Sequence, residues 1–157
     1  MVDLKPPRPV AGEKETVRAL LQYQRESFVR KLDGVDEESA RRRLVASDTT
    51  LLWLAKHLSK AERLWLVNRF AGLDETLPDD VVHGGDTLVA AVDAYRVTWA
   101  RVDDIVDRAD LDQMTANTGT ESPVSLRWVL MHLLEETARH AGHADILREL
   151  IDGDTGR

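Results

Sequence analysis

Residues 122–153 decide the fold, and their sequence is SPVSLRWVLMHLLEETARHAGHADILRELIDG. The segment reads as one long helix, because its apolar residues recur at every third or fourth position. Ser122 or Ser125 can cap its start, and Pro123 suits a first helical position. Gly153 follows the last apolar pair and can end the helix in the left-handed conformation. We expect the rest of the chain to pack around this helix.

Four chemically active side chains follow one line along this expected helix. His132, Glu136, His140 and His143 are separated by four, four and three residues. At about 100° per residue they fall within an arc of roughly 80°. Three apolar residues share the arc: Val129, Leu147 and Leu150. The line is therefore expected to face the interior, where three imidazoles and a carboxylate need an explanation.

The length and composition indicate one domain. A chain of 157 residues can bury a self-sufficient core. We expect an extended arm at residues 1–11, since three of the five prolines lie in the first ten residues. The helical domain then covers residues 12–153, and residues 154–157 form a tail. The chain has no cysteine, so a metal would have to be bound by histidine, aspartate or glutamate.

The charge balance argues against polyanionic partners. The chain carries 28 acidic and 21 basic residues, a formal net charge of −7, which disfavours a nucleic-acid-binding surface. The arginines at 41–43 follow three acidic residues and are expected to lie on a solvated short helix. No apolar run resembles a signal peptide or a membrane span, so we expect a cytoplasmic protein without membrane contact.

Helical periodicity recurs along the chain. The expected helices span about 12–32, 36–44, 49–69, 86–106 and 122–153, and the second of them is short. Two polar connections, about 70–86 and 110–121, are long for a bundle. The first either crosses the bundle or closes over a site, and its His83 is expected to be exposed. No segment alternates with period two, so the pattern predicts an all-α fold, a single four-helix bundle.

The expected helix at 49–69 also brings a histidine inward. His57 lies within an apolar stripe that has Trp53 one turn before it and Ala61 one turn after it. Together with Trp65 and His143, these neighbours are the candidates for the wall of a pocket around the histidine. The four tryptophans are otherwise expected to pack in the core: Trp53, Trp65, Trp99 and Trp128.

Glu136 and His140 have the spacing of a pair of metal ligands. At i and i+4 they lie side by side on a helix, and His57 on a facing helix can supply a third ligand. Two histidines and one carboxylate suit zinc or nickel and leave a coordination position open. His143 or His132 can add a fourth ligand or orient one by a hydrogen bond. The spacing equally fits a helical ion pair without metal, and both interpretations stay open here.

Two stretches carry a resemblance to a known family. LLWLAKHLSKAERLW and SLRWVLMHLLEETARHAGHADILRELIDG resemble the DinB-like superfamily, specifically its DUF664 branch, over about residues 15–153. The resemblance implies an up-down-down-up bundle that holds a divalent metal through His57, Glu136 and His140. Many members have histidine where this chain has Glu136. The His-Glu-His set instead resembles the zinc-containing mycothiol-dependent maleylpyruvate isomerase, although the additional C-terminal domain of that enzyme is absent from this sequence.

The resemblance also implies an activity. Relatives include thiol S-transferases that use mycothiol or bacillithiol, so we expect a metal-dependent enzyme acting on a small-molecule substrate. A metal-bound thiol or water would be its nucleophile, and a homodimer is plausible for the superfamily. The alternatives are a non-catalytic metal-binding or stress-associated bundle, and a metal-free module in which Glu136 and His140 pair with each other. In each case we expect His132 to be a hydrogen-bonded core histidine.

Overall fold

A computed structural model describes residues 5–119 and 121–155 of the chain. Its helices, in order, are α1 (Glu13–Leu32), α2 (Glu37–Ala40), α3 (Leu51–Glu62), the π-helix η1 (Arg63–Phe70), α4 (Leu88–Asp107) and α5 (Leu126–Asp152). Within the described residues, the β-type pairing is limited to one isolated antiparallel bridge between Met114 and Ser125. The all-α expectation is confirmed.

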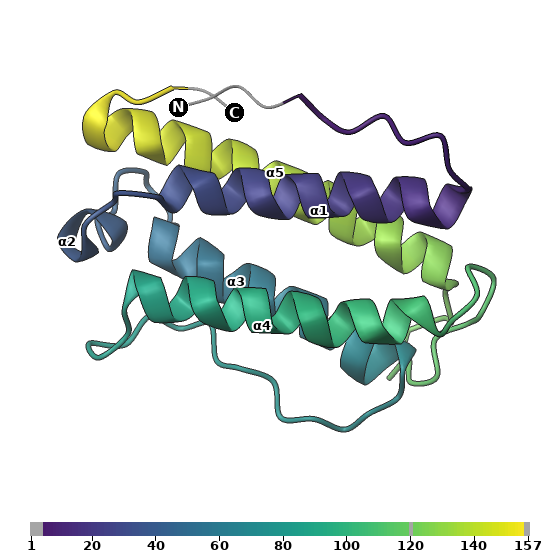
Figure 1. Cartoon of the computed structure of the whole chain (residues 1–157). Coiled ribbons are helices and arrows are strands. Elements are labelled where there is room, and N and C mark those ends of the chain that lie inside the picture. The colour runs from purple at the N-terminus through teal and green to yellow at the C-terminus, as the bar shows by residue number, and fades with distance from the viewer. Residues whose placement is uncertain (1–4, 120, 156–157) are drawn as a thin grey trace.

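The four long helical segments form a bundle. In Figure 1, α1 and α5 lie side by side and run in the same direction, while α3 and α4 run together in the opposite direction. This is the up-down-down-up order. Since α3 and α4 are parallel, the connection between η1 and α4 must return along the length of the bundle, and Figure 1 shows it doing so. The length of residues 71–87 is thus a requirement of the topology.

Side-chain caps set the starts of three long helices. In each case the side-chain hydroxyl of the capping residue accepts a hydrogen bond from a backbone N–H in the first turn. The capping residues are Thr50 for α3, Thr87 for α4 and Ser125 for α5. Ser122 and Pro123 therefore precede α5 instead of starting it. Gly153 ends α5 with φ of 77°, as expected. The short helix α2 stops at Ala40, so the arginines at 41–43 lie beyond it.

The expected helix at 49–69 changes its winding near the middle. From Arg63 onward it is a π-helix, whose wider turn is closed by i→i+5 hydrogen bonds. The buried residues Glu62, Leu66 and Phe70 are separated by four positions each time. In an α-helix, every step of four residues rotates the side chain by about 40°, so two steps would turn Phe70 away from the core. The wider π turn reduces this rotation.

A buried ion pair marks the junction of α3 and η1. The Arg25 guanidinium donates two hydrogen bonds to the Glu62 carboxylate, at 2.9 and 2.6 Å, and both side chains are almost fully buried. The Tyr95 hydroxyl donates a third, at 3.0 Å. Burial raises the pKa of Tyr95, and the Glu62 charge raises it further. These contacts join α1, α3 and α4, and the sequence pattern did not single out Arg25.

Residues 5–11 precede the first helix and are exposed and non-helical. Residues 1–4 of the expected arm and residues 156–157 of the expected tail lie outside the described residues. Among the helices described, none is long and apolar enough to cross a membrane.

Replacing Glu62 with glutamine tests the buried ion pair. The Glu62→Gln variant removes the bidentate partner of Arg25 and leaves the partly exposed Asp103, at 3.0 Å, as its carboxylate partner. We therefore expect the free energy of unfolding to fall by about 3 kcal/mol, the low end of the loss for a broken buried pair. Urea denaturation measures the change. The matched control is Glu135→Gln, which breaks an exposed pair with Arg139 on α5 and should change stability little. Equal stability of the two variants would contradict the structural role given to Glu62.

Candidate metal centre

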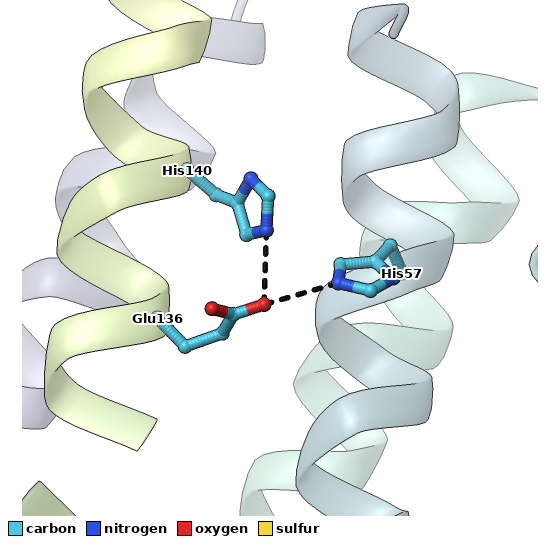
Figure 2. A group of neighbouring side chains, drawn as sticks. All are labelled: His57, Glu136 and His140. Carbon is cyan, nitrogen blue, oxygen red and sulfur yellow. Dashed lines mark hydrogen bonds and ion pairs between the residues drawn. The ribbon is translucent and has the colours of Figure 1, made fainter. Parts of the chain in front are cut away.

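Three of the residues singled out by the sequence meet between α3 and α5. Figure 2 shows His57 of α3 pointing at Glu136 and His140 of α5. The Oε1 atom of Glu136 lies 3.2 Å from Nε2 of His57 and 3.1 Å from Nε2 of His140. One ligand atom from each residue lies within 4.8 Å of the other two. The structure thus brings together two imidazole nitrogens and a carboxylate from opposite helices.

The spacing of these atoms fits a small divalent ion. Bonds of about 2.0–2.2 Å to a tetrahedral zinc place neighbouring ligand atoms roughly 3.3 Å apart. The two separations from the Glu136 oxygen, 3.1 and 3.2 Å, are close to this value. Three protein ligands would leave a coordination position open for a substrate.

A carboxylate on the far side of His57 adds a further reason to expect a cation. Nδ1 of His57 lies 3.2 Å from Oδ2 of Asp80, so the imidazole stands between two carboxylates. A neutral imidazole carries one N–H and can donate to only one of them. If the Nδ1 proton goes to Asp80, the Nε2 lone pair faces the Glu136 oxygen. A proton or a metal ion must then separate these two acceptors.

Asp80 is held in place by the connection to which it belongs. Residues 75–86 run back along the start of η1 and along α3, and three ion pairs hold them there. Arg63 of η1 pairs with Glu75 at 2.9 Å, and Lys60 and Lys56 of α3 pair with Asp80 at 2.7 Å and with Asp86 at 2.5 Å. The order of the acidic residues is the reverse of the order of their cationic partners, as expected for antiparallel segments. The sequence pattern predicts that this connection crosses the bundle or closes over a site, but it does not single out Asp80.

His143 orients His140, the second candidate histidine ligand. Nδ1 of His140 and Nδ1 of His143 lie 3.2 Å apart, so one imidazole donates to the other. When His140 donates, its Nε2 lone pair is free to face Glu136. His143 is exposed and borders a cavity of about 280 Å³ that Thr49 and Ile146 also line.

An aromatic ring packs against His57, the first candidate ligand. The Trp53 indole stacks on the His57 imidazole, with ring centroids 4.6 Å apart, and meets the His140 ring edge-on at 6.1 Å. Trp53 also lines a cavity of about 460 Å³ beside Thr50 and Val81. Of the other pocket candidates, Ala61 is half-buried and Trp65 lies farther along, next to His132.

The line formed by His132, Glu136, His140 and His143 on α5 lies at the edge of the buried face of the helix. This corrects the expectation that the whole line faces the interior. On a helical wheel starting at His132, Val129, Leu147 and His140 lie at about 60–80°, and these three are buried. His132, His143 and Leu150 lie at about 0–20°. They are half-buried or exposed, with Leu150 52 % exposed. Glu136, at about 40°, is between the two groups, so the cluster lies at the mouth of the interhelical space.

Two further expectations about aromatic residues also need correction. His132 is half-buried and forms no hydrogen bond within the described part of the chain, so it is not a hydrogen-bonded core histidine. Its ring stacks on Trp128, which is 44 % exposed and therefore not a core tryptophan. His83 is exposed as expected, and it contacts Asp79 at 2.6 Å.

The protonation states favour metal binding. Burial opposes ionisation of Glu136, but its contacts with the His57 and His140 imidazoles together hold the pKa of this carboxyl below its usual value. Burial lowers the pKa of His140, and the Glu136 charge only partly opposes that change. At neutral pH the cluster therefore offers a carboxylate and a neutral imidazole, the forms that bind divalent ions.

The fold and the cluster define a class of protein: helical bundles with a candidate metal centre between two helices. Residues 16–153 match the model of the mycothiol S-transferase family, and the chain belongs to this family. The resemblance to DinB-like proteins is thereby confirmed.

A solved structure supports the fold independently. The crystal structure described as a conserved protein of a locus from Enterococcus faecalis is similar, with a TM-score of 0.68 and 17 % sequence identity. The match covers 92 % of this chain and all of that one. A search of curated proteins found no match.

Titration of His140 in the metal-free protein tests the electrostatics. We expect NMR to give His140 a pKa below 6.5, and lower still in Glu136→Gln, because the carboxylate favours the imidazolium. Since the folded pKa is depressed, the stability due to neutral His140 is present above pH 6.5 and is lost as the pH falls through the folded value. Glu149→Gln, an exposed change on α5, is the control. A His140 pKa at or above 6.5 would contradict the assignment.

Proposed function

We propose that this protein is a metal-dependent S-transferase that joins a small thiol of the mycothiol type to an electrophilic substrate. His57, Glu136 and His140 are the proposed ligands of a divalent ion, zinc in the first place and nickel as the alternative. The observation that carries the proposal is the convergence of these three side chains in a chain of the mycothiol S-transferase family.

The reaction uses an external nucleophile, since the chain has no cysteine. A divalent ion at this site would lower the pKa of a bound thiol and favour its thiolate form. In the transfer, the sulfur forms a bond to an electrophilic carbon, the leaving group departs with its bonding electrons, and the thiol proton passes to solvent. No oxidant or reductant is needed.

Neighbouring side chains orient the imidazole rings of His57 and His140. Asp80 fixes the His57 ring through Nδ1, and Lys60 holds Asp80 in position. His143 does the same for His140. Trp53 covers one face of His57 and excludes water from it. A homodimer formed through a helix face and a cytoplasmic location stay predictions.

Removing single ligands tests the metal assignment and the activity together. In His57→Ala and His140→Ala we expect the zinc content of untagged protein to fall from about one ion per chain to near zero. Thiol conjugation to model electrophiles should fall with it. Elemental analysis gives the first quantity, and product formation with and without mycothiol gives the second.

His83→Ala is the matched control, because it removes an exposed histidine outside the cluster. Unchanged metal content in both ligand variants would show that the site is wrongly assigned. Metal binding without any thiol-dependent turnover would instead favour the non-catalytic, metal-binding alternative.

Replacing Asp80 tests whether the connection orients His57. We expect Asp80→Ala to weaken zinc binding by about 10–100-fold, the usual effect of losing a carboxylate that holds a ligating histidine. Competition with a chromophoric chelator measures the affinity. The neighbouring change Asp79→Ala removes an exposed carboxylate that contacts His83 and should leave the affinity unchanged. The same affinity in the two variants would show that Asp80 has no such role.

A further inference from the structure

A second aromatic group lies along the same interhelical space, beyond the metal centre. The rings of Trp65, Trp128 and His132 are in mutual contact, with centroids 4.9–5.2 Å apart. Trp65 belongs to η1, and the other two residues belong to α5. His132 is one helical turn from Glu136, or about 6 Å along the axis, and Trp128 is about 12 Å from it. We call these three residues the aromatic shelf.

Trp65 packs against the core, but Trp128 is not part of it. The outermost ring of the shelf, Trp128, is 44 % exposed although His132 stacks on it, with planes 18° apart. An exposed indole held in a fixed orientation leaves apolar area in contact with water, where it contributes little to folding. Such a ring is available to stack with a ligand.

A cavity of about 360 Å³ opens at the shelf. Trp65 and Trp128 form its aromatic wall, and the connection between α4 and α5 supplies hydroxyl and amide groups from Thr115, Thr118 and Asn117. This volume falls in the range of small-molecule sites, and an aromatic wall with a few polar groups is typical of them.

The charge of the cavity lining is balanced. Its cation, Arg69, lies 4.2 Å over the Trp65 ring and forms an ion pair at 2.8 Å with Glu121, which also lines the cavity. With this pair neutralised, the remaining lining is uncharged. A neutral ligand is therefore favoured over an anion or a cation.

We propose that the aromatic shelf binds the electrophilic substrate, and that this substrate is a neutral, planar aromatic compound with hydrogen-bonding substituents. The inference rests on the proposed transferase function. The His132 ring covers one face of the Trp128 indole and does not line the cavity, so a ligand ring would stack on the other face of Trp128, about two helical turns from Glu136. A substrate lying along α5 from this point would extend toward the metal centre. The thiol is then free to enter from the side of Trp53 and His143.

The corresponding reaction is an aromatic substitution. With chlorodinitrobenzene as the probe, the thiolate sulfur bonds to the ring carbon that carries chlorine, the carbon–chlorine bond breaks, and chloride leaves. The thiol proton goes to the buffer, and no redox partner takes part. Iodoacetamide reacts with the same thiol but has no ring to stack, so it serves as the aliphatic comparison.

The test combines kinetics with direct binding. In the zinc-loaded protein we expect Trp128→Ala to raise the KM for chlorodinitrobenzene about tenfold, because the variant loses the indole on which the substrate ring stacks. Turnover with iodoacetamide should be unchanged, and Trp128→Phe should restore most of the loss. Met131→Ala, an equally exposed change on the same helix, is the control. Equilibrium dialysis with unreactive dinitrobenzene should show the same tenfold loss of affinity in Trp128→Ala.

The outcomes separate this inference from the proposed function. If dinitrobenzene binds the wild type and Trp128→Ala equally well, the shelf is not a binding site, whether or not thiol transfer occurs. If binding depends on Trp128 but the wild type conjugates neither electrophile, the transferase function fails and the assignment of the ligand as its substrate fails with it. Equal loss with the aromatic and the aliphatic electrophile would also overturn the inference, since it would indicate general damage to the site.

Discussion

The Arg25–Glu62 ion pair is the contact on which the site geometry depends. It is buried, bidentate and further bonded by Tyr95, so it fixes three helices relative to one another. It also lies at the residue where α3 gives way to η1. The winding after this point sets the direction of Trp65, while the α-helical turns before it set the direction of His57. One buried pair therefore positions His57 and Trp65, the two residues through which α3 and η1 contribute to the candidate metal centre and to the aromatic shelf.

The helices and the ligand cluster could be predicted because their signals are local. Apolar spacing and capping residues placed the long helices to within a few residues, and Gly153 ends α5 as expected. The spacing of Glu136 and His140 placed them on one side of a helix. An inward-facing His57 on another helix was enough to suggest that they converge. A helical wheel does not show where the buried face of a helix ends. For this reason the line from His132 to His143 on α5 was expected to be more buried than it is.

The residues missed by sequence analysis act through contacts between distant segments. Arg25 lies in an ordinary amphipathic pattern, and its buried partner comes from another helix 37 positions away. Asp80 belongs to an acidic connection without periodicity, so nothing in its neighbours relates it to His57. The π-helix has only one trace in the sequence, the repeated spacing of four between Glu62, Leu66 and Phe70. Each of these features requires knowledge of the packing.

The three ion pairs that join residues 75–86 to α3 and η1 have a thermodynamic consequence. Asp80 is the middle of three pairs, so the free energy that docks the connection also orders His57. Such coupling is reciprocal: an ion that favours the ordered imidazole must, by the same amount, favour the docked connection. The side chains of these pairs are partly exposed, so added salt weakens the pairs and, with them, the ordering of His57 by Asp80. The salt concentration of the solvent therefore sets how firmly the connection is docked against the bundle.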